Sequence, residues 1–279
     1  MKCNSSLSSY SLKVSPLGGR LPEGIPIDLD LTKGELIKHE PVALIWRKIP
    51  VNGKQAVVKI YRRGLFVRLH SLTTYFRVQR EFDGLSHLET LGIPCSVPIF
   101  WCHGYLGPYG WGEILVTEYV AESQSLRNLL ATKSEVSSPL DLSSLFANMA
   151  KMHAAGVHHG ILRTKNILVE NYPEQPVFLF IDLPRFHRFP QDIRGKRMAR
   201  HDLMSLCEGL FQHFSEDTLR LWLLAYGIPE SERMDLLIQL KQFHSTASLR
   251  KIAAWEFDTR DALARFLSLY RPSSWWLLK

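Results

Sequence analysis

The stretch VHHGILRTKNILVE, residues 157–170, decides how this sequence is interpreted. It places His159, Leu162 and Asn166 in one polar loop, and the apolar run after Asn166 is typical of a β-strand. An amide oxygen such as that of Asn166 is a ligand that Mg²⁺ accepts. Near the centre of the loop stands Ile161, whose branched alkyl group can neither accept a proton nor form a hydrogen bond. The loop therefore predicts a cation site beside a position without an acid–base group.

The composition is that of a globular protein with a large core. The chain has 279 residues, of which 46% are hydrophobic and 11% are aromatic, and its mean hydropathy is -0.07. A chain of this length can form one large domain or two lobes of ordinary size. It contains no run of roughly 18 apolar residues, so we expect no transmembrane helix.

Residues 1–33 are expected to be a flexible leader, because they are rich in Ser, Gly and Pro. They contain no continuous apolar core of the kind that a secretory signal requires, so we expect the chain to stay in the cytosol. Widely spaced cysteines without a C-x-x-C pair favour reduced thiols over a zinc site or a disulfide framework. These cysteines are Cys3, Cys95, Cys102 and Cys207.

The charge of the chain indicates the kind of partner it attracts. The formal net charge is +7 and the isoelectric point is near 9.2. We therefore expect anionic partners such as nucleotides, phosphorylated glycans, acidic lipid headgroups or nucleic acid. Because no interleaved aromatic and basic motif of a nucleic-acid-binding module is present, no nucleic-acid partner is expected.

The first strand patterns of the segment 34–120 form a predicted hairpin. Apolar and polar residues nearly alternate over 42–46, and a second strand pattern covers 56–60. Between them lies the pair Asn52-Gly53, which is typical of the tight turn of a β-hairpin.

A helix pattern and two more strand patterns complete this half of the chain. Over residues 73–94, apolar residues recur at three- and four-residue spacings and stop at Gly92, which predicts an amphipathic helix. A Gly-Pro-Tyr-Gly turn at 107–110 separates two short strand patterns. We therefore expect a small sheet covered by one main helix.

Helical patterns dominate the rest of the chain, and they cover 125–132, 142–156, 201–214, 217–228 and 261–270. The sequence therefore predicts an α+β protein of two lobes with a hinge near residues 118–123. The N-lobe, a small β-sheet with one main helix, is expected at 34–120. The C-lobe, larger and mostly helical, is expected at 121–279.

Four polar residues follow one another in the order that phosphoryl transfer from ATP requires. Lys59 ends a strand pattern and can hold nucleotide phosphates, and Glu81 in the predicted helix can pair with it. Asn166 and Asp182 each adjoin an apolar strand pattern and can supply oxygen ligands to Mg²⁺. One such residue alone is more often merely solvated. All four in this order, with a change of lobe after the second, indicate a nucleotide site.

With these residues the chain resembles the protein-kinase superfamily and, more narrowly, the bacterial lipopolysaccharide kinases that phosphorylate Kdo or heptose in the inner core. Residues 157–170 fit the pattern H-x-D-L-x-x-x-N except at Ile161. Further motifs are REFDGLSHLETLGIPCSVP, IDLPR in place of D-F-G, and RHDLMSL, in which Asp202 matches the aspartate that braces the catalytic loop. The resemblance covers roughly residues 34–270.

The resemblance implies a two-lobed protein-kinase-like fold that binds ATP and Mg²⁺. The reaction it implies is transfer of the γ-phosphoryl group to a sugar hydroxyl of the lipopolysaccharide core or another anionic glycan. The implied nucleotide-binding residues are Lys59, Glu81, Glu118 and Val120, and the implied metal ligands are Asn166 and Asp182.

The catalytic positions implied by the resemblance all lie in the loop. They are His159, Arg163, which would neutralise charge on the transferring phosphoryl group, and Ile161, the vacant position of the general base. General-base assistance contributes about 10² to 10⁴ in rate, but positioning and charge neutralisation supply most of the acceleration of phosphoryl transfer. Two alternatives therefore remain: a kinase of reduced activity, or a pseudokinase that binds nucleotide and regulates or scaffolds an enzyme of envelope biosynthesis.

Other features bear on the acceptor and on membranes. The basic residues of the predicted activation segment either grip an acidic glycan or form a solvated loop; they are Arg185, Arg188, Arg194, Lys196, Arg197 and Arg200. Trp275 and Trp276 either pack on the helical lobe or seat at the cytosolic face of an inner membrane. His158, His159 and His201 lack the spacing of a zinc site.

Overall fold

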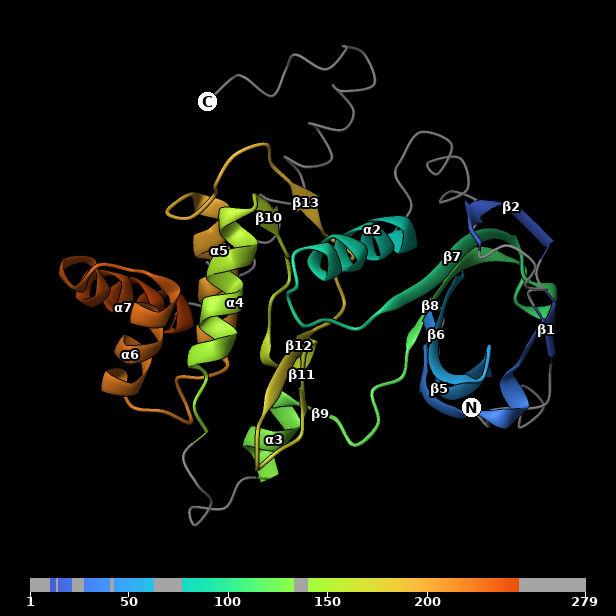
Figure 1. Ribbon diagram of the computed structural model, residues 1–279, viewed down its shortest axis with the longest axis horizontal. Coiled ribbons are helices and arrows are strands. Elements are labelled where there is room, and N and C mark those ends of the chain that lie inside the picture. Colours follow the sequence, from blue (N-terminus) through green and yellow to red (C-terminus); the bar gives the residue numbers. More distant parts are fainter. Residues whose placement is uncertain are drawn as a thin grey trace.

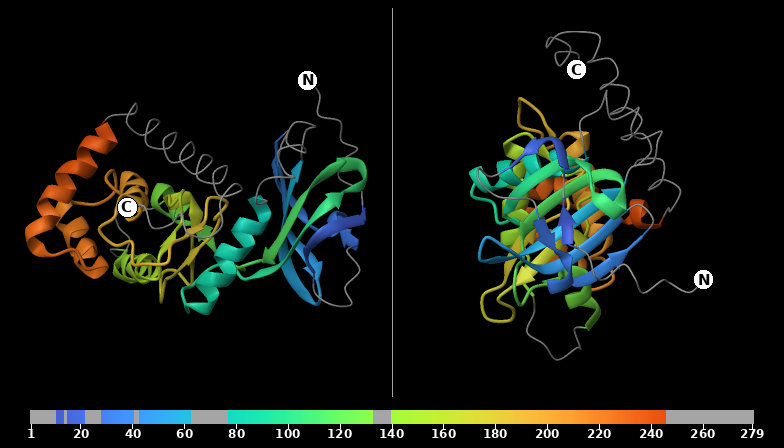
Figure 2. Two further views of the ribbon diagram at one scale, coloured as in Figure 1. Left: turned by 90° about the horizontal axis from the view of Figure 1, so that it is seen from above. Right: turned by 90° about the vertical axis from the view of Figure 1, so that its right-hand side faces the viewer.

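The structure is a computed structural model that describes residues 11–13, 15–21, 28–40, 43–62, 77–132 and 140–245. Two lobes lie side by side along the longest axis, a sheet-based N-lobe and a mostly helical C-lobe, with helix α2 (Arg77–Thr90) between them (Figures 1 and 2). This arrangement confirms the predicted α+β fold class.

The N-lobe is built on one antiparallel sheet with the strand order β2-β7-β8-β6-β5-β4. Its strands are β2 (Ser15–Arg20), β4 (Glu35–His39), β5 (Ala43–Val51), β6 (Lys54–Arg62), β7 (Pro98–Tyr105) and β8 (Trp111–Glu118). Strands β5 and β6 form the predicted hairpin, and Asn52 and Gly53 at its turn have φ angles of 52° and 77°. Such positive angles are those that an Asn-Gly turn adopts readily. The Gly-Pro-Tyr-Gly turn contains the 3₁₀ helix η3 (Gly107–Tyr109), between β7 and β8.

Alternate side chains of β6 point to opposite faces of the sheet. Ala56, Val58 and Ile60 are buried in a cluster on one face of the sheet, and the residues between them point to the opposite face. On that opposite face, Val57, Lys59 and Tyr61 line a cavity. One strand thus supplies both the core of the N-lobe and a wall of the candidate site.

Helix α2 connects the cores of the two lobes. Val78 and Phe82 pack into a cluster with residues of β7 and β8, while Leu85 and Leu88 belong to the main cluster of the C-lobe. Side chains three and four positions apart share a helix face, so a single amphipathic helix can serve both cores. The position of Glu81 on this helix is therefore fixed from both sides.

The segment expected to be a flexible leader contributes structure in its described part. Strands β1 (Ser11–Lys13) and β3 (Asp28–Asp30) pair with each other, and β2 pairs with β7 at the edge of the main sheet. The 3₁₀ helix η2 (Leu31–Lys33) follows. Leu12, Leu29 and Leu31 are buried in the cluster on the outer face of the sheet. The expectation of a loose leader is therefore wrong for these residues, because their leucines cover apolar surface that the main strands leave open.

The C-lobe packs its helices around one apolar cluster with two small antiparallel sheets. The helices are α3 (Leu126–Thr132), α4 (Ser143–Ala154), α5 (Arg197–Glu208), α6 (Glu216–Tyr226) and α7 (Glu230–Ser245). The sheets contain β9 (Gln124–Ser125), β11 (Ile167–Glu170) and β12 (Val177–Phe180) in one, and β10 (Val157–His158) with β13 (His187–Arg188) in the other. The 3₁₀ helix η4 (Thr164–Asn166) leads into β11.

One helix of the structure has no counterpart among the predicted segments. Helix α7 was not expected, because its apolar residues are spread around the helix instead of forming one stripe. The expected helix at 261–270, Trp275 and Trp276 lie outside the described residues. Within the described part of the chain, no helix is both long and apolar enough to cross a membrane.

Candidate active site

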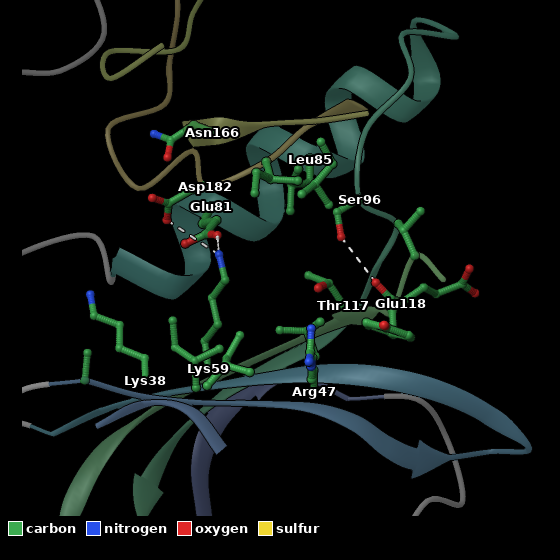
Figure 3. A pocket seen from close by; sticks show the side chains of 18 of the residues that line it. Lys38, Arg47, Lys59, Glu81, Leu85, Ser96, Thr117, Glu118, Asn166 and Asp182 are labelled. Carbon is green, nitrogen blue, oxygen red and sulfur yellow. Dashed lines mark hydrogen bonds and ion pairs between the residues drawn. The ribbon is translucent and has the colours of Figure 1, made fainter. Parts of the chain in front are cut away.

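A cavity of about 490 Å³ lies between the lobes. Strands β4, β5, β6 and β8 and helix α2 supply its N-lobe wall, and η4, β11 and the residues after β12 supply the opposite wall. Figure 3 shows Lys59 rising from the sheet toward Glu81 and Asp182, with Asn166 beyond them. Residues that are far apart in the sequence therefore meet in one cleft.

Lys59 is the centre of an ionic group at one end of this cleft. Its Nζ forms an ion pair with Glu81 Oε1 and lies 3.5 Å from Asp182 Oδ1. The Glu81 side chain is fully buried and that of Lys59 is 13% exposed, so solvent screens this pair little. The structure contains the pair of Lys59 and Glu81 that was expected from the sequence, and it places Asp182 beside them.

The charges of Lys59 and Asp182 stabilise each other, whereas burial raises the pKa of Glu81. Burial opposes the charge on Lys59, but Glu81 and Asp182 outweigh it and raise the pKa of the amine. Burial likewise opposes the charge on Asp182, but Lys59 and Arg77 outweigh it and lower the pKa of the carboxyl. Lys59 is therefore a fixed cation and Asp182 a fixed anion at neutral pH.

Asp182 is held in an unusual backbone conformation. Its φ angle is 63°, in the left-handed region that non-glycine residues seldom occupy and that recurs at functional sites. The next residue, Leu183, is fully buried in the C-lobe cluster. The buried leucine anchors the chain directly after the turn that presents the carboxylate to the cleft.

Asn166 lies beside Asp182 with its amide orientation defined. Its Nδ2 donates a hydrogen bond to the backbone carbonyl of Ile161 at 2.8 Å, and Figure 3 shows the amide oxygen directed toward Asp182. An amide oxygen next to an ionised carboxylate is a donor set that suits Mg²⁺. The residues present therefore fit the metal that the sequence analysis expected.

The loop that carries Ile161 is braced by a buried carboxylate. Asp202 of α5 accepts hydrogen bonds from the backbone N–H groups of His159, at 2.8 Å, and Gly160, at 3.0 Å. His153 Nε2 lies 3.3 Å from the same carboxylate. Burial opposes the charge on Asp202, but the neighbouring imidazoles, with His158 contributing most, outweigh it and hold its pKa far below the usual range. The backbone of the loop is thus well fixed although Ile161 replaces an acid.

All three residues grouped with the catalytic positions stand outside the cavity. His159 is fully buried, and its Nε2 lies 3.2 Å from the carbonyl oxygen of Ile181, which can only accept a hydrogen bond. His159 therefore ties the loop to the end of the strand before Asp182. It was expected among the catalytic side chains, but its contacts are those of a positioning residue. Arg163 is exposed and accepts a backbone hydrogen bond from Asn166 at 2.8 Å. Ile161 is half-buried, and none of the three lines the cavity.

The cavity wall also contains apolar residues. Val57 lines it from the N-lobe sheet and Leu168 from β11. Glu118 and Val120, expected to bind nucleotide, both line the cavity at the segment that joins the lobes. The Glu118 carbonyl accepts a hydrogen bond from Ser96 Oγ at 3.4 Å, as Figure 3 shows, and the side chain of Glu118 pairs with Lys54.

Four cations of the cavity wall were not predicted from the sequence: Lys38 of β4, Arg47 of β5, Arg77 of α2 and Lys165 of η4. Arg77 precedes Glu81 by four positions, a spacing that places both on one helix face and that could have identified it. Lys38 and Lys165 carry no comparable signal, because an isolated lysine in a strand or loop is usually just solvated.

The histidines without zinc-like spacing also come together. Ligand atoms of His158, His201 and Asp202 lie within 4.8 Å of one another. Since both Asp202 oxygens already accept backbone hydrogen bonds, the buried cluster serves the loop. Burial of these imidazoles makes the free energy of unfolding depend on pH.

We expect the free energy of unfolding to fall when the pH is lowered from about 6.5 to about 4. Burial lowers the pKa of His158 to about 4, whereas an unfolded histidine titrates near 6.5. Between these values the unfolded chain binds the additional proton, so acidification favours unfolding, by up to about 3 kcal/mol for this group. The carboxyl of Asp202 adds to this loss of stability only below its ordinary pKa of 3.8, because its pKa in the folded protein lies below that value.

Urea unfolding between pH 4.5 and 7 measures this dependence. His158→Gln is expected to flatten the profile, while His213→Gln, at an exposed position, is expected to leave it unchanged. A wild-type profile that is flat over this range, or a His158→Gln profile as steep as that of the wild type, would contradict the expectation.

The two lobes, the buried Lys59–Glu81 pair and the loop braced by Asp202 define the class of this protein as protein-kinase-like. The sequence profile described as "Lipopolysaccharide kinase (Kdo/WaaP) family" matches residues 46–223, more than half of the chain. The chain belongs to this family.

Among solved structures, the chain is similar to one titled "WaaP in complex with acyl carrier protein". The TM-score is 0.59 at 19% sequence identity, and the match covers 76% of this chain and 88% of that one. At this identity the likeness shows the fold alone. No curated protein matches the sequence significantly.

Proposed function

We propose that the protein is an ATP- and Mg²⁺-dependent kinase that transfers the γ-phosphoryl group to a sugar hydroxyl of the lipopolysaccharide core. The observation that carries the proposal is the ionic group of Lys59, Glu81 and Asp182 with Asn166 in one cleft. Family membership gives the class of acceptor. The missing base at Ile161 predicts a low rate of transfer.

The residues of the cleft have separate tasks in this mechanism. Lys59, aimed by its ion pair with Glu81, holds the phosphates of ATP. Asn166 and Asp182 would hold Mg²⁺, which neutralises charge on the phosphates when it is bound. Arg163 stands exposed outside the cavity wall, from where its long side chain can approach the transferring group as the acceptor binds. Positioning and charge neutralisation carry the reaction where no side chain at 161 accepts the proton.

The acceptor is expected to lie against the segment from the end of β12 into the first turn of α5. Arg188, Arg194, Lys196, Arg197 and Arg200 are exposed along it. Arg194 is paired with Asp192 at 2.7 Å. The positive charge of this segment as a whole would attract a phosphorylated, acidic glycan. An acceptor of this kind places the protein at the cytosolic face of the inner membrane.

A pseudokinase that binds nucleotide and regulates or scaffolds an enzyme of envelope biosynthesis is the second candidate. Ile161 favours it, because an alkyl side chain cannot accept the proton of the attacking hydroxyl. Incubation of the purified protein with labelled ATP, Mg²⁺ and deacylated core oligosaccharide separates the two candidates. Label in the glycan supports the kinase; label that stays in ATP, in a protein that binds it, supports the pseudokinase.

Both candidates require nucleotide binding, so ATP with Mg²⁺ is expected to raise the melting temperature. At ligand concentrations of 10 to 100 times Kd the shift is expected to be about 3–8 °C. Lys59→Met is expected to lose most of this shift, because it removes the cation that holds the phosphates. Lys33→Met, at an exposed position outside the cavity, is the matched control. A folded wild-type protein with no shift at millimolar ATP and Mg²⁺ would exclude both candidates.

A further inference from the structure

Arg77 stands at the same end of the cavity as the ionic group around Lys59. It is the first residue of α2, one helical turn before Glu81, and it lines the cavity together with Lys59 and Asp182. Its charge lowers the pKa of Asp182, next after that of Lys59 among the charges that do so. Arg77 is therefore a second cation at the place where the proposed function puts the phosphates.

The guanidinium of Arg77 is partly preorganised. Its Cζ lies 4.4 Å from the centre of the Tyr61 ring, within the range of a cation–π interaction. The Tyr61 ring itself is 9% exposed and packs in the cluster between the sheet and α2. Among the residues that the structure describes, the guanidinium makes no hydrogen bond or ion pair at contact distance. The aromatic contact therefore fixes its place and leaves its planar set of N–H donors for a ligand.

The turn between β4 and β5, where Glu40 and Ala43 line the cavity, explains why a side chain is needed to bind phosphate there. Between Ile37 and Lys59 the only glycine is Gly53, which lies in a different turn, the one between β5 and β6. In the turn between β4 and β5, the N–H of Glu40 donates to the carbonyl of Ala43 at 2.9 Å, and the N–H of Ala43 donates to the carbonyl of Glu40 at 3.3 Å. Backbone donors that are already paired cannot cradle a phosphate, which is how glycine-rich loops bind it.

We propose that Arg77 is a phosphate-binding residue that does, at the open end of the cavity, what backbone amides of a glycine-rich loop do elsewhere. The inference rests on the proposed function for the source of the phosphate, which is the β,γ end of ATP. A phosphate of the acceptor glycan would offer the same chemistry. Arginine suits either group because its fork of donors binds two phosphate oxygens at once.

Binding of ATP with Mg²⁺, AMP and inorganic tripolyphosphate, measured by calorimetry, tests the proposal. The variants are Arg77→Ala, Arg77→Lys and, as the matched control, Arg127→Ala, an exposed helix arginine outside the cavity. Arg77→Ala is expected to weaken ATP and tripolyphosphate binding by about 10-fold, the effect of losing one charge-assisted contact, and AMP binding less than twofold. Arg77→Lys is expected to recover part of the loss, because it restores the charge without the fork. Thermal unfolding confirms that each variant is folded.

The outcomes separate this proposal from the proposed function. If the wild type binds ATP, and Arg77→Ala matches Arg127→Ala both in the binding of every ligand and in KM for the phosphorylated glycan, the Arg77 proposal is overturned and the kinase proposal stands. If the wild type binds tripolyphosphate through Arg77 but does not bind ATP, the phosphate site stands and the nucleotide function falls. Unchanged ATP affinity with a raised KM for phosphorylated but not dephosphorylated glycan would assign the phosphate to the acceptor. Failure of the wild type to bind any of these ligands overturns both.

Discussion

Ile161→Asp is expected to raise the rate of phosphoryl transfer to a core-sugar acceptor by about one to four decades, because it supplies a general base to a site that is otherwise assembled. The loop around position 161 is already held: Asp202 binds two backbone N–H groups before it, and Asn166 donates to its carbonyl at 2.8 Å. A new carboxylate would therefore start from a fixed backbone. Nucleotide affinity is expected to change little, because the base contacts the acceptor hydroxyl.

The rate is measured with labelled ATP, Mg²⁺ and deacylated core oligosaccharide in the wild type and in each variant. Ile161→Asn is the matched control, since an amide has nearly the shape of a carboxylate but does not act as a base. Asp182→Ala, in either background, is expected to abolish transfer because it removes the carboxylate that would hold the metal. If Ile161→Asp stays at background while ATP binds, the acceptor site has lost more than its base and the pseudokinase alternative is correct. A wild type that already turns over at an ordinary kinase rate would show that another group accepts the proton.

Asp202→Asn is expected to lower the free energy of unfolding by about 3–5 kcal/mol, the range for breaking a buried charged group away from its partners. The carboxylate is fully buried, and its two oxygens accept from His159 N at 2.8 Å and Gly160 N at 3.0 Å. An asparagine of the same shape has one acceptor oxygen, so its amide N–H₂ group would face a backbone N–H. One buried donor then lacks an acceptor, and the loop loses the anchor that precedes position 161.

Urea unfolding at pH 7 measures this loss, and Asp217→Asn provides the comparison. The Asp217 side chain is 91% exposed and lies 3.7 Å from Arg220, so its replacement is expected to cost less than about 1 kcal/mol. Equal stabilities of the two variants would show that Asp202 does not brace the loop. A second readout is the rescue by Ile161→Asp, which is expected to be smaller in the Asp202→Asn background because the new carboxylate would stand on a loosened loop.

Local sequence patterns were sufficient for much of the fold. The Asn52-Gly53 turn, the alternation in β6 and the helix that ends near Gly92 depend on residues close in the chain, and the structure contains all three. The order Lys59, Glu81, Asn166, Asp182 could also be read from the sequence. Backbone periodicity sets the direction of Lys59 within a strand and of Glu81 on one face of a helix, and Asn166 and Asp182 adjoin strands. Their roles in catalysis remain predictions.

Contacts between distant segments could not be predicted in this way. Leu12, Leu29 and Leu31 look like parts of a loose leader until the outer face of the sheet is present to bury them. Helix α7 has no single apolar stripe and is defined by its packing on α5 and α6.

Taken alone, the sequence determined the kinase-like order of residues and the absence of a base at Ile161, since both are properties of a linear pattern. Only the tertiary structure decided that His159 is buried beneath the loop and that Arg77 faces the cavity. The physical reason is that burial and charge depend on what a side chain meets across the fold. For His159 that neighbour is the Ile181 carbonyl, and for Arg77 it is the Tyr61 ring.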